Sequence, residues 1–195
     1  MKIIKIILII IKILIMIVTA SSQNADHQIE RSGFVIGFNV GSGFINVSDD
    51  YGDVPFETTQ GSFSFPNLKL GWMLNERTAL LASFQGAIYE KDGKDRSFDA
   101  ILPTVQYWAG DRWWFSLGMG LALDTPALYE NDIKNENWNF GGAMSIGTGI
   151  ELVQKQNYAF DISSSILLGG VKVKDIENGH RGGAVFSVTL GFTWY

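Results

Sequence analysis

The sequence GAVFSVTLGFTWY, from Gly183 to Tyr195, ends the chain and alternates between two kinds of side chain. Large apolar residues occupy one parity, namely Phe186, Val188, Leu190, Phe192 and Trp194. Hydroxyl residues and one glycine occupy the other, namely Ser187, Thr189, Gly191 and Thr193. A period of two predicts a β-strand. Because the stretch carries no charge, we expect its apolar face to contact lipid and its polar face to be enclosed.

Seven earlier segments alternate in the same way, over residues 33–41, 66–74, 78–89, 98–108, 113–124, 140–152 and 158–169. The connections between the eight segments run alternately long and short, and the charged run EKDGKDR at 90–96 is among the long ones. Short periplasmic turns and longer outer loops have this rhythm. The sequence therefore predicts an all-β fold, an eight-stranded antiparallel up-and-down transmembrane β-barrel with four extracellular loops.

The N-terminus predicts export. Lys2 and Lys5 precede a run of Ile, Leu, Met and Val that ends in small residues at Thr19 and Ala20, which is the layout of a secretory signal peptide. An uncleaved anchor is the alternative, but Lys12 interrupts the apolar run. We expect residues 1–20 to be removed, 21–32 to form a short periplasmic lead and 33–195 to form the outer-membrane barrel.

Charge and cysteine content exclude several classes. Removing residues 1–20 takes away three of the 15 basic residues and none of the 20 acidic ones, so the mature net charge is −8. An acidic exported protein is a poor candidate for nucleic-acid binding. The chain has no cysteine, which excludes disulfides and thiolate metal sites.

The aromatic residues support the same orientation. Tryptophan prefers the lipid–water interface. Five tryptophans lie at segment ends next to short turns or the C-terminus, which are the expected periplasmic ends: Trp72, Trp108, Trp113, Trp114 and Trp194. We expect the lipid-facing set to include Leu117, Met119, Leu121, Ile146, Ile162, Val188 and Leu190. Pro66 and Pro103 each remove a ladder donor, which favours bulges or rims at these positions.

A secreted lipocalin-like barrel that binds a ligand is the competing fold. Such a barrel packs bulky apolar residues inward and shows charges outward. Here the polar parity consists mostly of Gly, Ala, Ser and Thr, which are small enough to fill a narrow interior. This asymmetry favours the membrane barrel.

These features together resemble the OmpA- and OmpX-type small outer-membrane barrels along the whole mature chain. The C-terminal strand is similar to the family's insertion signal at Thr189, Gly191 and Trp194, although the chain stops one residue before the usual final aromatic. The resemblance implies a surrounding of outer-membrane lipid and lipopolysaccharide, and recognition of the last strand by the barrel-assembly machinery. No periplasmic domain follows the barrel in this sequence.

Candidate chemistry is sparse. Lipid A deacylase barrels use a His and Ser pair, but His27 falls in the lead and His180 lacks a Ser two positions on. Asp49, Asp50 and Asp53 could hold surface Ca²⁺ but lack a recognisable liganding loop. The glycines from Gly141 to Gly149 lie along a strand, so we interpret them as inward residues and not as a phosphate loop. No cofactor and no enzymatic activity are expected.

Four charges fall on the predicted inward parity of the periplasmic half: Lys69, Arg77, Glu151 and Asp161. A lone charge in a narrow interior is costly, so we expect these charges to pair or form one network, with Arg77 and Glu151 reaching water at the rim as the alternative. Lys69 and Asp161 are the better candidates, and we expect them to help plug the barrel. Eight strands leave an interior that side chains fill. The sequence thus favours a closed surface barrel that acts through its loops on an unknown extracellular partner, ahead of a narrow passive pore or a lipid A-modifying enzyme.

Overall fold

A computed structural model of the chain describes residues 30–50, 56–129, 138–174 and 176–195. The predicted signal peptide, most of the lead, His27 and Asp53 lie outside the described residues, so the predictions about them stay predictions. Within the described ranges, no helix has the length and apolar character to cross a membrane.

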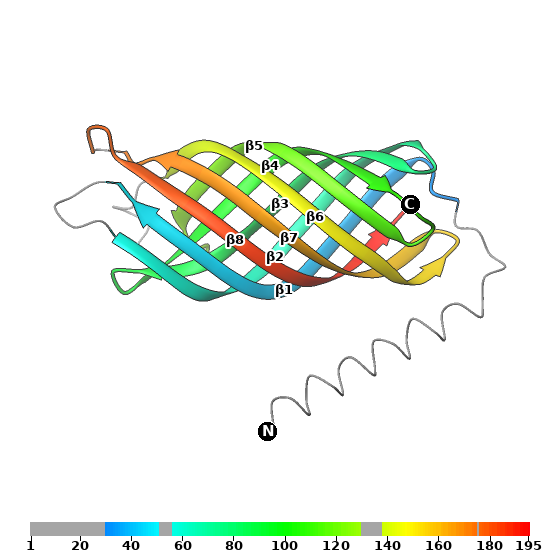
Figure 1. Cartoon of the computed structure of the whole chain (residues 1–195), viewed down its shortest axis with the longest axis horizontal. Coiled ribbons are helices and arrows are strands. Elements are labelled where there is room, and N and C mark those ends of the chain that lie inside the picture. The colour runs from blue at the N-terminus through cyan, green and yellow to red at the C-terminus, as the bar shows by residue number, and fades with distance from the viewer. Residues whose placement is uncertain (1–29, 51–55, 130–137, 175) are drawn as a thin grey trace, which may run out of the picture.

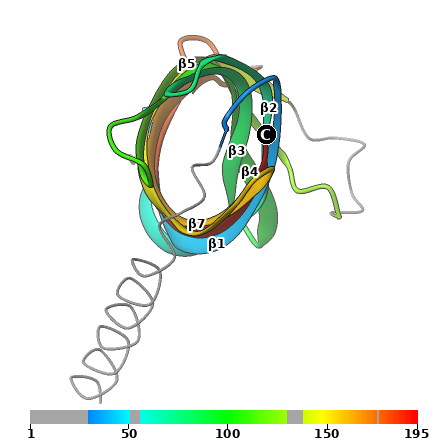
Figure 2. The same cartoon turned by 90° about the vertical axis from the view of Figure 1, so that its right-hand side faces the viewer.

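The eight predicted strands are present and form one closed antiparallel barrel in chain order (Figures 1 and 2). The last strand pairs with the first, and all other neighbours in the barrel are neighbours in sequence. This confirms the predicted fold class. The strands are β1 Phe34–Asp49, β2 Phe56–Asn75, β3 Thr78–Lys91, β4 Lys94–Trp108, β5 Trp113–Pro126, β6 Asn139–Lys155, β7 Tyr158–Lys172 and β8 His180–Trp194.

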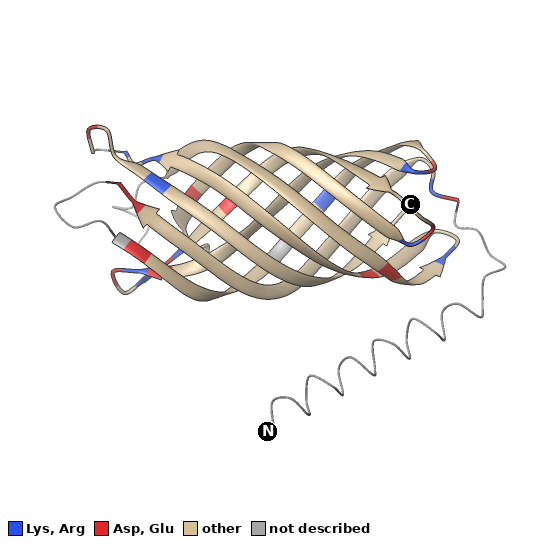
Figure 3. Ribbon diagram, viewed as in Figure 1, with Lys and Arg blue, Asp and Glu red and all other residues tan. Residues whose placement is uncertain are grey.

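The alternation in sequence separates side chains that point into the barrel from side chains that lie on its outer surface. Large apolar side chains on one parity are exposed on the outer surface, as Leu117, Met119 and Leu121 are at 54%, 66% and 45%. Ile146, Val188 and Leu190 are also exposed, whereas Ile162 is half-buried. An apolar outer band of this kind faces lipid in outer-membrane barrels. Charged residues gather toward the two ends of the barrel (Figure 3).

The strands extend further than predicted, which corrects one connection. The charged run at 90–96 was predicted to be a long loop, but β3 and β4 pair up to Lys91 and Lys94. Only Asp92 and Gly93 connect them, with φ of 54° and 73°, a pairing typical of a tight type I′ hairpin turn. Charged residues are tolerated there because the strands continue beyond the apolar band. The β3–β4 connection is therefore a tight turn and not one of four long outer loops.

The two prolines behave differently. The β1–β2 register shifts between Asn39 and Gly41, which pair with Asn67 and Ser64, and Pro66 lies within this shift. Pro103 pairs with Ala82 across β3–β4 without a shift. The bulge expected at Pro66 is present, and Pro103 lies inside β4 in an unshifted register.

The interior is layered, and β1 shows the order of the layers. Val35, near the periplasmic end, belongs to an inner apolar cluster with Met73, Ala79, Leu81, Trp108 and Trp114. Ile45 and Val47, near the outer end, belong to an outer apolar cluster that includes Tyr89, Phe98, Leu102, Leu167 and Val185. Polar residues such as Asn39 lie between the two clusters, together with Lys69 and Asp161. Further charged residues lie beyond each cluster.

Two of the predicted interface tryptophans are inside the barrel. Trp108 is fully buried and Trp114 is 6% exposed, whereas Trp72, Trp113 and Trp194 are about half exposed on the outer surface. The prediction for Trp108 and Trp114 was wrong because the alternation of side chains along each strand, and not the distance from a turn, decides which side chains face outward. Tyr107 and Trp113 take the outward parity, so their neighbours Trp108 and Trp114 point inward.

Candidate functional site

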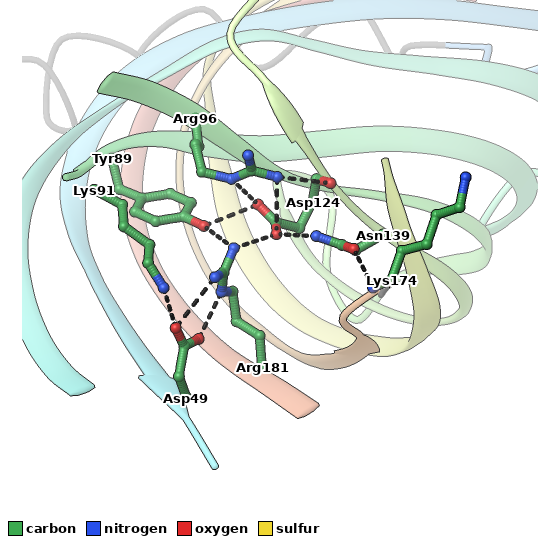
Figure 4. A network of polar contacts seen from close by, with 8 residues as sticks. All are labelled: Asp49, Tyr89, Lys91, Arg96, Asp124, Asn139, Lys174 and Arg181. Atoms are coloured by element: carbon green, nitrogen blue, oxygen red, sulfur yellow. Dashed lines mark hydrogen bonds and ion pairs between the residues drawn. The ribbon is translucent and has the colours of Figure 1, made fainter. Parts of the chain in front are cut away.

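A network of charged and polar side chains fills the outer end of the lumen (Figure 4). This outer network comprises Asp49, Tyr89, Lys91, Arg96, Asp124, Asn139 and Arg181, which come from β1, β3, β4, β5, β6 and β8. Each of these residues lies on the inward parity near the outer end of its strand, so closure of the barrel brings them together.

Asp124 is the central acceptor of the outer network and is completely buried. Its carboxylate accepts hydrogen bonds from the Tyr89 hydroxyl at 2.8 Å, Arg96 Nε at 3.0 Å, Asn139 Nδ2 at 2.9 Å and Arg181 Nη1 at 2.5 Å. Hydrogen bonds from this many donors compensate a carboxylate for the water that it loses on burial. Asp124 therefore joins its own strand, β5, to four other strands at one point.

Arg181 links Asp124 to the end of β1. Its Nε donates to Asp49 Oδ1 at 2.6 Å and its Nη2 donates to Asp49 Oδ2 at 3.1 Å, a bidentate pair. Lys91 also contacts Asp49. Because β1 and β8 are the two ends of the barrel sheet, the Asp49–Arg181 pair closes the sheet at its outer rim.

A second network, the inner network, closes the periplasmic end of the lumen. Glu151 is 1% exposed and accepts hydrogen bonds from Arg31 Nη2 at 2.8 Å, Trp108 Nε1 at 2.8 Å, Gln154 Nε2 at 2.6 Å and the Tyr195 hydroxyl at 2.6 Å. The Arg31 guanidinium also lies over the Trp108 ring, 4.8 Å from its centroid. Burial raises the pKa of the Tyr195 phenol well above its usual value, so the hydroxyl stays protonated and donates to Glu151.

A polar chamber lies between the two apolar clusters. Along β4 the inward residues run Leu102, Thr104, Gln106 and Trp108; the first and last belong to the outer and inner clusters, and the middle two line the chamber. The cavity has a volume of about 60 Å³. Its further lining is mostly hydroxyl and amide side chains with one cation: Asn39, Asn67, Lys69, Ser83, Gln85, Ser116, Ser145, Ser163, Ser165 and Thr189.

Three of the four charges predicted to share one lumen network lie in the lumen, and Asp161 is within electrostatic reach of both Lys69 and Glu151. Lys69 and Asp161 are buried inside the barrel, with Lys69 Nζ 5.3 Å from the centroid of the Trp114 ring. Glu151 belongs to the inner network, where its cation is Arg31. Arg77 is exposed in the tight turn between β2 and β3, so its predicted place in the lumen is corrected to the rim.

The remaining candidates are dispersed. Thr189 and Gly191 point inward and Trp194 points outward at the end of β8, and their role in insertion stays a prediction. His180 is exposed at the start of β8. Asp49 belongs to the outer network and Asp50 is exposed, so these two do not form a common site. Among the described residues, no group of three or more His, Cys, Asp or Glu could hold a metal ion.

Most of the network residues were missed in the sequence because strands were ended too early. Extending the inward parity outward from the last apolar residues reaches Asp49, Arg96 and Arg181. Asp124 already fell on the inward side of a predicted strand. Arg31 carried no such signal, since it precedes β1 and sits in the lead.

Comparisons with known proteins support the fold. No family model matches the chain, and no curated protein matches it in sequence. Among solved structures, neisserial surface protein A matches with a TM-score of 0.54 and 16% identity, over 84% of this chain and 97% of that one. The attachment invasion locus protein Ail of Yersinia pestis matches with a TM-score of 0.45 and 12% identity, over 82% and 99%.

The outer-membrane protease OmpT from Escherichia coli also matches, with a TM-score of 0.39 and 7% identity, over 85% of this chain and 97% of that one. Identities this low bear on the fold and not on the activity. The apolar outer band is the independent physical observation, because it suits a bilayer and not water. The chain therefore has the fold of the small eight-stranded β-barrels of the bacterial outer membrane.

Proposed function

We propose that this protein is a closed, non-enzymatic outer-membrane barrel that contributes to the membrane as a scaffold and contacts surface molecules through its outer loops. The observation that carries the proposal is the filling of the lumen. Two buried charge networks and two apolar clusters occupy it in succession, with the chamber of about 60 Å³ between them. Such a lumen suits a scaffold better than a passage.

The outer end offers the surface for recognition. The connection between β5 and β6 exposes Leu128 at 94% and Tyr129 at 59%, and Trp138 at its other end is 54% exposed. Loops carry recognition on rigid scaffolds. Deleting residues 130–137 is expected to alter binding to surface molecules while the barrel still shifts on gels with heating.

Outer-membrane lipid, including lipopolysaccharide, is the proposed surrounding of the apolar band. Assembly through the last strand, with Thr189, Gly191 and Trp194 as its signal, belongs to the same proposal. Trp194→Leu keeps an apolar side chain on the outer surface, so it should lower the amount of folded barrel in cells without changing the unfolding free energy in liposomes. A fall in both quantities would assign Trp194 to stability instead.

Conductance in planar bilayers tests the closed scaffold. We expect no steady conductance from the wild-type barrel, because ion pairs close both ends. Lys69→Ala and Asp161→Ala test the proposal that lumen charges assist this closure, and either should raise conductance. A wild type that conducts steadily, with the same conductance in both variants, would support the passive pore.

His180→Ala should leave lipid A composition unchanged, and a lost lipid A species would indicate an enzyme.

A further inference from the structure

Among the residues whose placement is described, the backbone ladder between β2 and β3 covers only part of the length of these strands. β2 and β3 pair from the periplasmic turn up to Leu68 and Phe84. Beyond that pair, β2 continues toward Phe56 on β1 alone, and β3 continues to Lys91 on β4 alone. Each of the other seven strand pairs extends to the outer end of the barrel. We call the outer part of the β2–β3 boundary the seam.

Side chains of β2 bridge the seam in place of the ladder. Asn67 Oδ1 accepts a hydrogen bond from Gly86 N at 3.1 Å, and Ser64 Oγ donates to Gly86 O at 2.6 Å. Further out, the Gln60 amide donates to Glu90 O at 2.7 Å and accepts from Glu90 N at 2.8 Å. Side-chain bonds can break by rotation without displacing a strand. The seam is therefore the part of the wall that opens at least cost.

The polar chamber lies directly behind the inner end of the seam. Leu68, Phe84 and Gln85, where the pairing ends, belong to its lining. A volume of about 60 Å³ has room for roughly four water molecules or one small polar group.

The chamber is lined by buried polar atoms that have no hydrogen-bond partner among the described residues. Gln106 is 2% exposed, and its Nε2 is a buried donor with no partner in the described part of the chain. Asn39 Oδ1 is a buried acceptor that likewise has no hydrogen-bond partner among the described residues. Lys69 also lines the chamber. A group that both donates and accepts, such as a hydroxyl, satisfies this set.

The outer side of the seam is apolar with one polar residue. Phe44 and Phe63 are 60% and 53% exposed on the adjoining strands β1 and β2. Asp99 of β4 covers the outward side of Gly86, since a Cβ added to that glycine would lie 1.9 Å from Asp99 Oδ1. A molecule approaching from lipid thus meets an apolar surface, then a carboxylate, then the seam.

We propose that the seam is a side entrance from the lipid phase to the chamber, and that the chamber binds the hydroxyl group of a small amphipathic molecule. The hydroxyl would occupy the space between Gln106, Asn39 and Lys69, and the apolar tail would remain at the seam near Phe63. Entry along the barrel axis is blocked by the outer and inner networks.

A cysteine probe tests the route, because the chain has no cysteine of its own. Ser116→Cys places a thiol in the chamber lining, and its reaction with methyl methanethiosulfonate is followed in liposomes. Asn67→Ala should speed the reaction about tenfold, the factor expected when two hydrogen bonds of ordinary strength are lost. Ser64→Ala also removes two hydrogen bonds, one to Gly86 across the seam and one from Asn67, so it should speed the reaction by a similar factor.

Asn139→Ala is the matched control. Asn139 is also a buried asparagine that donates to one side chain, Asp124, and accepts from one backbone N–H, that of Lys174, but it lies in the outer network. The change weakens the outer network without touching the seam, so we expect any acceleration to be clearly smaller than that caused by Asn67→Ala. An equal or larger acceleration by Asn139→Ala would establish axial entry, and no acceleration by Asn67→Ala or Ser64→Ala would show a sealed wall. Either result overturns the side entrance.

The ligand class is tested with the same thiol. Dissolving 1-hexanol in the liposomes should protect Cys at position 116 from labelling, whereas hexane at the same membrane concentration should not. Gln106→Leu should abolish the protection, because it removes the unpartnered donor. Equal protection by both compounds, or by neither, would show that the chamber has no hydroxyl site and would overturn the proposal of a ligand.

Discussion

The two ends of the lumen are closed by the same device built from different parts of the chain. At each end a buried carboxylate accepts hydrogen bonds from four residues, Asp124 at the outer end and Glu151 at the inner end. The partners of Asp124 all belong to strands. Two partners of Glu151, Arg31 and Tyr195, lie outside the strands at the two ends of the described chain.

This difference predicts different roles in folding. The outer network draws side chains from six strands, so it is complete only when the whole barrel has closed. The inner network secures the chain ends to β4 and β6 after the strands are in place. We therefore expect disruption of the outer network to weaken the entire barrel and disruption of the inner network to act more locally.

The largest effect is expected from Asp124→Ala. Removing the acceptor of four donors in a buried network should lower the free energy of unfolding by about 3–5 kcal/mol. Urea unfolding in liposomes, followed by tryptophan fluorescence and by heat-dependent gel mobility, measures it. Asp50→Ala removes an exposed carboxylate next to the outer network and serves as the control. Similar losses of unfolding free energy in both variants would show that the outer network does not stabilise the closed barrel.

A charge on the lipid side should cost slightly less than a broken outer network. Leu121→Arg places a guanidinium on the apolar band without the partners that Arg181 has inside, and should destabilise the barrel by roughly 2–4 kcal/mol if it lies at the bilayer midplane. Leu121→Met controls for the change in shape.

Spin labels at Leu117 and Leu121 should respond to lipid-soluble quenchers. A response to aqueous quenchers would show that these side chains of β5 face water and not lipid.

Glu151→Gln tests the inner network at its centre. The change keeps the size of the side chain but removes the negative charge that pairs with Arg31, and should cost about 2 kcal/mol. Arg31→Ala and the double variant complete a cycle, in which a coupling free energy of about 1–2 kcal/mol is expected. Additive effects would mean that Arg31 contributes through its ring contacts and its bond to the Asp111 carbonyl, and not through Glu151.

The sequence predicted the barrel, its strand order and its facing because these depend on the parity of side chains along each strand. It did not predict the networks, because they depend on which strand ends meet. Asp49, Arg96 and Arg181 looked like loop charges when strands were ended at their last apolar residue. Trp108 and Trp114 were misplaced when position near a turn was given more weight than parity. The seam could not be predicted at all, since it depends on where the pairing between β2 and β3 ends.

The smallest effect is expected from Tyr195→Phe, which separates the hydroxyl of the last residue from its ring. The variant keeps the edge contact with Trp108, whose ring centroid lies 5.9 Å away, but loses the 2.6 Å bond to Glu151. Because the acceptor is a charged group, the loss should be about 1–2 kcal/mol. Refolding into liposomes without assembly factors excludes any effect on recognition of the C-terminal strand. Tyr107→Phe, on the exposed outer face, is the control. If Tyr195→Phe were as neutral as Tyr107→Phe, the C-terminus would only cover the inner network, and Arg31 would be the one chain-end residue that secures it.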